Sequence, residues 1–226
     1  MTSQELLNPQ DHGQLRLLPR MGAQPHFVQI VPGEFVAAAI SCPILFSKDA
    51  ATGAFYAGAV LGLKPGEGAL KSAEERGGFE PLSLQRDGFF ISGERIAIDR
   101  ANPRFSETEG ELLFDDAQQP STALRRVQRV LGQLHEGIQQ TAALVRDLVN
   151  LKLLEPIDVA LSFDDGERLR LEGLYTVSRD SLRELEDAHV LRLFRSGHLQ
   201  LAYTIAGSLN QLAILAHVRN RKLAEG

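Results

Sequence analysis

Residues 157–172 read IDVALSFDDGERLRLE and contain the clearest local signal in the chain. Apolar residues alternate with polar ones on both sides of the pair Asp165-Gly166. An Asp-Gly pair between two alternating runs is typical of a tight turn, and the alternation indicates strands with one buried face. The segment therefore predicts a β-hairpin and, with it, an antiparallel sheet.

A second hairpin is expected near the N-terminus. Residues 27–31 are rich in the branched and aromatic side chains of strands, and Pro32 begins a short helix that continues to Ile40. Two apolar runs follow at residues 44–46 and 55–63, separated by polar turn residues, and they are predicted to pair with each other. Two shorter strands are expected at residues 89–92 and 95–99.

The pattern between the two hairpins is helical. From Thr122 to Leu153, apolar residues recur at spacings of mostly three and four, which places them on one face of a helix. Ser121 or Thr122 is expected to cap its N-terminus, and Pro156 lies just after its end. Shorter helices are expected from Arg179 to Asp187 and from Leu209 to Lys222. The predicted fold class is α+β, an antiparallel sheet from the two hairpins covered by the long central helix and the C-terminal helices.

Length and composition fit a globular protein. The 226 residues are 43% apolar and 23% charged, an ordinary mixture for a packed domain. Residues 1–24 are polar and aperiodic, so we expect an arm that lies on the surface or is partly disordered. A single domain is predicted over residues 25–220, followed by a tail over residues 221–226.

Composition also bears on partners and compartment. With 24 basic and 29 acidic residues the net charge is −5, and tryptophan is absent, which argues against nucleic-acid binding. Residues 1–8 lack the charged and apolar regions of a secretory signal. The most continuous apolar tracts that we identify, residues 35–40 and 55–63, are too short to span a bilayer. We therefore expect a cytoplasmic protein that neither inserts into membranes nor binds nucleic acid.

No catalytic or cofactor motif is visible in the sequence. The six histidines are scattered, and no two have the spacing of metal ligands. The single cysteine, Cys42, lies among apolar residues, which favours packing over nucleophilic chemistry. The glycine-rich segment 62–68 lacks the order of a phosphate-binding loop and is interpreted as a surface turn. We predict no catalytic residue, no metal and no cofactor, and the oligomeric state is left open.

The order of motifs along the chain resembles the bacterial SapC family. The resemblance begins at His26 with a strand that runs into a helix carrying Glu34-Phe35. It continues through the strand Cys42-Pro43-Ile44-Leu45-Phe46 and includes the Ala-Val-Leu-Gly-Leu strand at residues 59–63. Further motifs follow in the family's order: Leu113-Phe114-Asp115, Leu171-Glu172-Gly173-Leu174-Tyr175, Gly197-His198-Leu199 and Ser208-Leu209. No single motif is diagnostic, but the succession extends from His26 to about Val218.

The chain departs from the family pattern after the first hairpin. Family members tend to have a tryptophan and a Pro-Phe pair in this region. Here Phe79 stands at the tryptophan position and Gly88-Phe89 replaces the Pro-Phe pair, whereas Pro81 and Arg86 are kept. The specificity of any ligand surface formed by this segment is therefore expected to differ.

The resemblance implies an association with the bacterial cell surface, because the family is named for genes linked to a crystalline surface layer. Such genes also lie beside genes for outer-membrane receptors, flavin-dependent halogenase-like enzymes and cupin-like oxygenases. Our preferred hypothesis is a non-catalytic binding or accessory protein with a protein or peptide partner, working with a cell-surface or nutrient-uptake system. The alternative is a peptide-presenting partner of, or an enzyme acting with, a halogenase-like or cupin-like oxygenase.

Two sets of residues are candidates for binding. The predicted ligand-binding set is His26, Glu34, Phe79, Arg86 and His198. Glu34 lies on an otherwise apolar helix, where it either caps the helix or takes part in chemistry. The predicted partner surface is Arg125, Arg126 and Arg129, on the face of the long helix away from the leucines. This face either binds an acidic partner or a phosphate, or is simply solvated.

Overall fold

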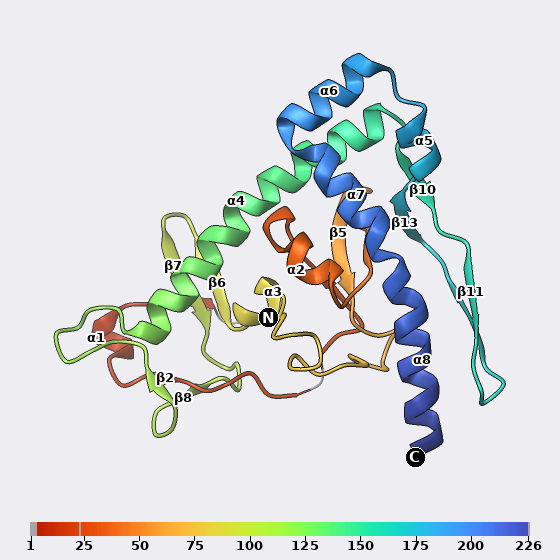
Figure 1. The fold of residues 1–226 in the computed structure, drawn as a ribbon. Helices are drawn as coiled ribbons and strands as arrows, with labels where there is room; N and C mark the ends of the chain where they lie inside the picture. Colours follow the sequence, from red (N-terminus) through yellow and green to blue (C-terminus); the bar gives the residue numbers. More distant parts are fainter. Residues whose placement is uncertain (1–3, 23, 226) are drawn as a thin grey trace. The chain divides into compact units, whose positions relative to one another are not determined.

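A computed structural model describes residues 4–22 and 24–225 (Figure 1). Helices and antiparallel strands are both present, so the predicted α+β class is confirmed. The chain divides into two compact units, one formed by Met1–Gly22 and Leu82–Glu136, the other by Ala23–Pro81 and Gly137–Gly226. We call them unit 1 and unit 2. The predicted boundaries of a single domain over residues 25–220 stay a prediction.

Unit 1 consists of short strands, two short helices and the first half of helix α4 (Thr122–Asn150). One sheet has the order β1-β7-β6, with β1 (Gln4–Leu6), β6 (Phe89–Ser92) and β7 (Arg95–Asp99). A second has the order β8-β2-β9, with β2 (Arg16–Leu17), β8 (Phe105–Ser106) and β9 (Glu111–Leu112). The short helices are α1 (Pro9–His12) and α3 (Leu82–Gln85). The strands expected at residues 89–92 and 95–99 are confirmed.

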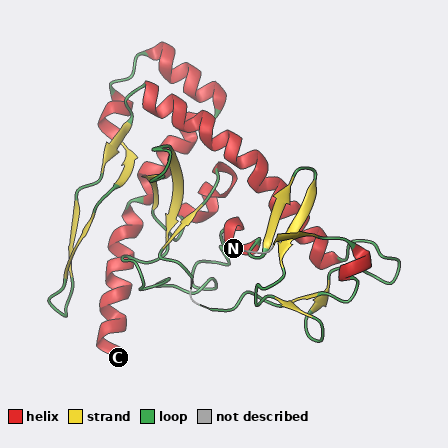
Figure 2. Cartoon of the chain, turned by 180° about the vertical axis from the view of Figure 1, so that it is seen from behind, coloured by secondary structure: helices red, strands yellow, loops and turns green. Residues whose placement is uncertain are grey.

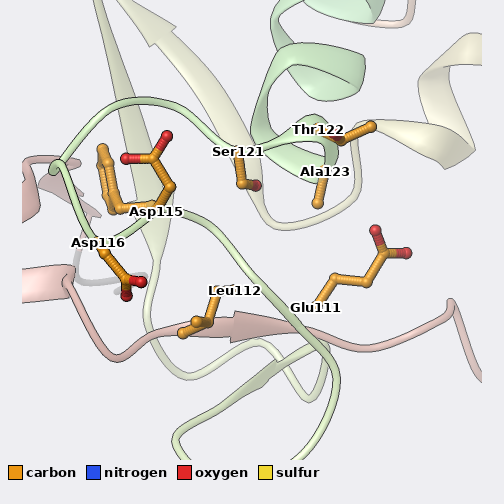
Figure 3. Close-up of a pocket in the computed structure, with 8 residues that line it drawn as sticks. Glu111, Leu112, Asp115, Asp116, Ser121, Thr122 and Ala123 are labelled. Atoms are coloured by element: carbon orange, nitrogen blue, oxygen red, sulfur yellow. The ribbon is translucent and has the colours of Figure 1, made fainter.

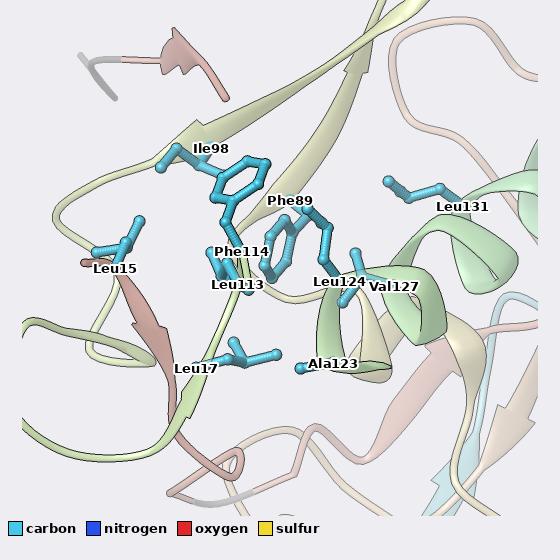
Figure 4. Packing of buried hydrophobic residues seen from close by; sticks show 10 residues of the cluster. All are labelled: Leu15, Leu17, Phe89, Ile98, Leu113, Phe114, Ala123, Leu124, Val127 and Leu131. Carbon is cyan, nitrogen blue, oxygen red and sulfur yellow. The ribbon is translucent and has the colours of Figure 1, made fainter. Parts of the chain in front are cut away.

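A hydrophobic cluster holds unit 1 together (Figure 4). Helix α4 contributes Ala123, Leu124, Val127 and Leu131, and β6 and β7 contribute Phe89 and Ile98. The N-terminal segment, expected as an arm, adds Leu15 and Leu17, which are only 2% and 8% exposed. Burying these leucines removes apolar area from water, which gives this segment a fixed place in unit 1.

Unit 2 contains a five-stranded antiparallel sheet in the order β10-β13-β4-β5-β3. Its strands are β3 (Phe27–Gln29), β4 (Ile44–Lys48), β5 (Phe55–Val60), β10 (Leu154–Pro156) and β13 (Leu174–Val177). The predicted N-terminal hairpin is confirmed, because Ile44 lies opposite Ala59 and Lys48 lies opposite Phe55. This hairpin forms the middle of the sheet.

The Asp165-Gly166 hairpin is also confirmed, as strands β11 (Val159–Ser162) and β12 (Arg168–Leu171). These two strands form a ladder of their own, and the flanking strands β10 and β13 enter the five-stranded sheet instead. Gly173 lies between β12 and β13 with a φ of 72°, a left-handed conformation that lets the chain turn from one ladder to the other. The second hairpin therefore contributes to the sheet through its continuations.

The helices of unit 2 cover the sheet and the hairpin. They are the 3₁₀ turn η1 (Pro32–Glu34), α2 (Phe35–Ala39), α5 (Arg179–Arg183), α6 (Asp187–Ser196), α7 (His198–Ser208) and α8 (Asn210–Glu225). Helix α7 packs against α2, β4 and β13. Both views show α8 and the β11–β12 hairpin side by side (Figures 1 and 2), where Leu212, Leu215 and Val218 share a core cluster with Phe163 and Leu171.

The predicted long helix is confirmed as α4, and Ser121 caps it. The Ser121 Oγ accepts a hydrogen bond from the Leu124 N–H at 3.2 Å. The helix runs without a break through Gly132 and Gly137.

One apolar stretch was missed by the sequence analysis. In the described chain, the helical segment His198–Ala224 is long and apolar enough to cross a membrane by length and composition, and 39% of its apolar window is buried inside the protein. A buried core helix of a soluble protein meets the same criteria, so the segment does not by itself indicate a membrane span.

Candidate functional site

The five predicted ligand-binding residues have different neighbours. Arg86 lies in unit 1, and the other four, His26, Glu34, Phe79 and His198, lie in unit 2. The structure gives each of them contacts of its own, described in turn below. Their joint role in binding a ligand therefore stays a prediction.

Glu34 is buried and shapes the chain before helix α2. Its Oε2 accepts a hydrogen bond from the Val31 N–H at 2.9 Å, which is the backward half of a capping box. Val31 in turn lies so close to helix α4 that a Cβ added to Gly137 would be 2.5 Å from the Val31 Cβ. The carboxylate thus holds the backbone of Val31 at the point of closest approach between this segment and α4, in line with the capping alternative.

His198 forms a polar cluster with residues of α4 and α6. Its Nδ1 lies 2.7 Å from Asp147 Oδ2, and Arg192 Nη2 lies 3.4 Å from the other carboxylate oxygen, Oδ1. Because a carboxylate accepts hydrogen bonds, Nδ1 is the protonated nitrogen of the ring. The cluster joins α4, α6 and α7.

His26 and Phe79 are anchored through their backbone. The His26 carbonyl accepts hydrogen bonds from the N–H groups of Leu61 and Gly62, at 2.7 and 2.9 Å. The Phe79 carbonyl accepts from Arg76 Nε at 3.2 Å. Arg76 is itself buried, donates to the Lys71 carbonyl and to Gln24 Oε1, and has its pKa lowered by burial. The loop that carries Phe79 is thus held by a buried arginine that no sequence pattern indicated.

Arg86 supports a turn in unit 1. Its Nη1 donates to the Phe89 carbonyl at 3.1 Å, and its guanidinium lies 5.6 Å from the centre of the Phe90 ring. The buried Arg104 has a similar role, donating to the carbonyls of Gln85 and Asp87 at 2.8 and 3.0 Å. Arg104 thus satisfies carbonyls at the end of α3 and in the turn that follows, and Arg86 satisfies the carbonyl of the first residue of β6.

A third buried arginine was also missed by the sequence analysis. Arg219 of α8 donates from Nε to Glu67 and from Nη2 to Glu167, and its guanidinium lies 4.0 Å from the centre of the Phe163 ring. Lys64 Nζ donates to both oxygens of Glu167, at 2.9 and 3.0 Å. These residues come from three segments remote in sequence, so only the folded chain brings them together.

The charges of this cluster are mutually stabilised. Hydrogen bonds from Lys64, and next from Arg219, lower the pKa of Glu167. Burial opposes the charge of Arg219, but its bonds to Glu67 and Glu167 outweigh burial and raise its pKa. The cluster clamps α8 to the tip of the β11–β12 hairpin.

The three arginines of the predicted partner surface are exposed on α4. Arg126 Nη2 lies 3.6 Å from Glu111 Oε2 in unit 1, with both side chains more than half exposed. An ion pair this exposed contributes little to stability. Arg125 and Arg129 flank it, and the binding of an acidic partner by this face stays a prediction.

Each unit has a shallow hollow among its described residues. The hollow in unit 1, about 360 Å³, lies at the start of α4 and is lined by Glu111, Asp115, Asp116 and Ser121 (Figure 3). Asp115 Oδ1 accepts from the N–H groups of Ala117 and Gln119, so this carboxylate shapes its own loop. Within the described residues, no group of three or more histidine, cysteine or acidic side chains is placed to hold a metal ion.

The hollow in unit 2, about 380 Å³, is lined in part by Arg179, Asp180 and Arg183. Arg179 Nη2 donates to the Ala206 carbonyl at 3.0 Å, and Arg183 Nη1 lies 3.6 Å from Asp180 Oδ1. Arg179, Asp180 and Arg183 are thus engaged within the protein.

Comparison with known proteins bears on the whole chain. The SapC family model matches residues 7–215 of the 226 residues. The chain belongs to the SapC family. No curated protein and no solved structure matches it, so membership carries no activity with it.

The SapC match begins earlier than the resemblance seen in the sequence, which started at His26. It includes the N-terminal segment that forms α1 and β2. Leu15 and Leu17 of this segment lie in the core of unit 1, so the segment is part of the SapC fold.

Gly88, one of the positions where the sequence is expected to depart from the family pattern, has a left-handed backbone. Its φ is 84°, and a Cβ added there would lie 3.0 Å from the Phe105 ring. Proline holds φ near −65°, so a proline at this position is incompatible with the turn seen here.

Proposed function

We propose that this SapC-family protein is a non-catalytic binding or accessory protein that binds another bacterial protein, and that it works from the cytoplasm with a cell-surface or nutrient-uptake system. The observation that supports the proposal is an uncharged apolar surface on unit 2. We define it as the α2–α8 surface, formed by Val36 and Ile40 at helix α2 and Ile214 of helix α8.

All three side chains of this surface are exposed. Val36 is 57% exposed, Ile40 is 74% exposed and Ile214 is 44% exposed. Gln211 Nε2 donates to the Ile40 carbonyl at 3.0 Å, which places the end of α2 beside the first turn of α8. Ile214 follows Gln211 by three residues and so lies on the same side of α8. The three side chains therefore belong to one surface.

The segments that form this surface carry almost no charge. Residues 35–47 and 199–216 contain no lysine, arginine, aspartate or glutamate. Apolar side chains gain about 25 cal/mol for each Å² removed from water, whereas a charged partner surface would lose hydration here without gaining an ion pair. We therefore specify the partner as a protein with an apolar, uncharged contact surface.

Site-specific photo-crosslinking in the native host tests the proposal. A photoreactive residue at position 40 is expected to capture one partner protein, and the same residue at Ala51, an exposed position in the β4–β5 turn, is the matched control. The change Ile40→Glu in a competing untagged chain should no longer compete for that partner. Products that contain only a second copy, only lipid, or the same proteins at both positions would overturn the proposal.

A thermal-shift screen tests the non-catalytic part of the proposal. Divalent metals, flavins, nicotinamides and 2-oxoglutarate are each expected to leave the melting temperature unchanged. A ligand that binds only the folded state raises that temperature according to its affinity. Saturable stabilisation by any one of these compounds would contradict an accessory role and favour an enzyme.

A further inference from the structure

The β11–β12 hairpin of unit 2 has open edges. Its two strands pair only with each other in the described part of the chain, although the flanking strands belong to the five-stranded sheet. Residues Ala160, Ser162, Arg168 and Arg170 along it are exposed. An open strand edge presents N–H and C=O groups that another extended chain can pair with.

The register shows which backbone groups point outward. Phe163 and Glu167 flank the turn on either side. The Phe163 N–H donates to the Glu167 carbonyl at 3.0 Å, so these two residues form a hydrogen-bonded pair. Bonded and non-bonded pairs alternate along an antiparallel ladder. The pairs Ser162 with Arg168 and Ala160 with Arg170 are therefore non-bonded pairs. On β12, the N–H and C=O groups of Arg168 and Arg170 point away from β11.

The two faces of the hairpin differ in chemistry. Leu169 and Leu171 lie on the face that packs toward α8, in the core cluster with Leu215. Arg168 and Arg170 lie on the opposite face, and both are exposed. A strand added to β12 would place every second side chain beside the leucines and the others beside the two arginines.

Charge selects among possible occupants of this edge. In a second copy paired antiparallel through β12, Arg168 and Arg170 would oppose each other across the two-fold axis, and like charges directly opposite are destabilising. An acidic side chain at the same position of an added strand would instead lie beside the guanidinium of Arg168 or Arg170 on β12. Arg170 already pairs in this way with Asp158, the residue before β11, through Nε and Nη2 to Oδ1 at 3.1 and 2.8 Å; both side chains are more than half exposed, so this pair is weak.

We propose that the outer edge of β12 binds an extended peptide segment in which apolar and acidic residues alternate. The segment adds as a third antiparallel strand, through backbone hydrogen bonds at Arg168 and Arg170 and through their positive charge. This interaction surface is separate from the α2–α8 surface and goes beyond the proposed function.

Fluorescence anisotropy with two labelled heptapeptides tests this inference on the full chain. The probes are Val-Glu-Val-Glu-Val-Glu-Val and its lysine counterpart Val-Lys-Val-Lys-Val-Lys-Val. We expect the acidic probe to bind, the basic probe not to bind, and added salt to weaken the complex. Failure of the acidic probe to bind, or equal binding of the two, would overturn the proposal.

Proline substitutions separate the two edges. Arg170→Pro removes an outward N–H of β12, and we expect it to weaken binding by roughly tenfold or more, from one lost backbone bond and one lost charge. Ala160→Pro removes the matching outward N–H of β11 and is expected to leave binding unchanged. An equal effect of the two changes would assign the site to neither edge and contradict the proposal.

Charge reversal gives a test that does not depend on proline. The double variant Arg168→Glu/Arg170→Glu is expected to lose the acidic probe and to bind the basic one. Retention of the original preference would show that these arginines do not select the peptide. None of these variants alters the α2–α8 surface, so a failure here leaves the proposed function untouched, and the reverse also holds.

Discussion

Replacing Gly137 with alanine is expected to destabilise the protein, whereas the same change at Gly132 of the same helix is expected to stabilise it. Alanine is favoured over glycine in a helix interior by about 1 kcal/mol, and this gain applies to both positions. A Cβ at Gly132 would meet nothing within 4 Å, so the gain there is unopposed. We expect Gly132→Ala to raise the free energy of unfolding by about 0.5–1 kcal/mol.

At Gly137 the added methyl group would collide with Val31. It would lie 2.5 Å from Val31 Cβ, 2.5 Å from Cγ2 and 2.8 Å from Cγ1. These atoms are close to the backbone of a buried branched residue, so they cannot swing aside. Overpacking of this kind costs about 1–3 kcal/mol, and we take the upper half of that range. After subtracting the helix gain, Gly137→Ala should lower stability by about 1–2 kcal/mol.

Chemical denaturation followed by circular dichroism, with calorimetry in parallel, measures both changes. For a chain of this length, 1 kcal/mol corresponds to a shift of roughly 2–4 °C in melting temperature. The double variant Gly137→Ala/Val31→Ala removes two of the three clashing atoms, so its loss should be smaller than the sum of the single losses. Equal stabilisation by alanine at both glycines would refute the close approach of α4 to Val31.

Three further predictions concern single contacts. Glu34→Ala leaves the buried Val31 N–H without its acceptor and should cost about 1–3 kcal/mol in denaturation experiments, whereas Glu34→Gln, which keeps an acceptor oxygen, should cost less. The pKa of Glu167 is lowered below 4.5 in the folded state, so its contribution to stability is present above pH 4.5 and is lost as the pH falls through the folded-state pKa. In acid titration, Glu167→Gln should lose less stability on acidification than the parent chain. Identical stability curves for the two proteins would contradict the clamp with Lys64 and Arg219. Leu15→Ala should cost about 2–5 kcal/mol by the same assay, as for any buried leucine, and a neutral result would mean that the N-terminal segment is a dispensable arm.

Most secondary structure could be predicted because its signals are local. The alternation on both sides of Asp165-Gly166 and the spacing of apolar residues along α4 depend only on which side chains are neighbours in sequence. The resemblance to the SapC family was confirmed for the same reason, since it rests on the order of such motifs. The place of Leu15 and Leu17 in the core could not be predicted, because two leucines are too few to show a period.

The candidate sites were predictable only in part. Glu34 was singled out as the charged residue of an apolar helix, and its capping contact followed from that position. Arg76, Arg104 and Arg219 carry no sequence signal, because an arginine that donates to buried carbonyls or carboxylates looks in the sequence like any surface arginine. What distinguishes them is burial, which no local pattern records.

The sequence by itself determined the α+β class, the two hairpins, the long helix and the family, because periodicity, turn residues and motif order are properties of neighbouring residues. Only the tertiary structure decided that the second hairpin forms its own ladder and that its β12 edge faces outward with two arginines. It also decided that Gly137 meets Val31 and that Arg219 meets Glu67 and Glu167. Such contacts depend on distances between residues far apart in the chain, which are set when the whole core packs.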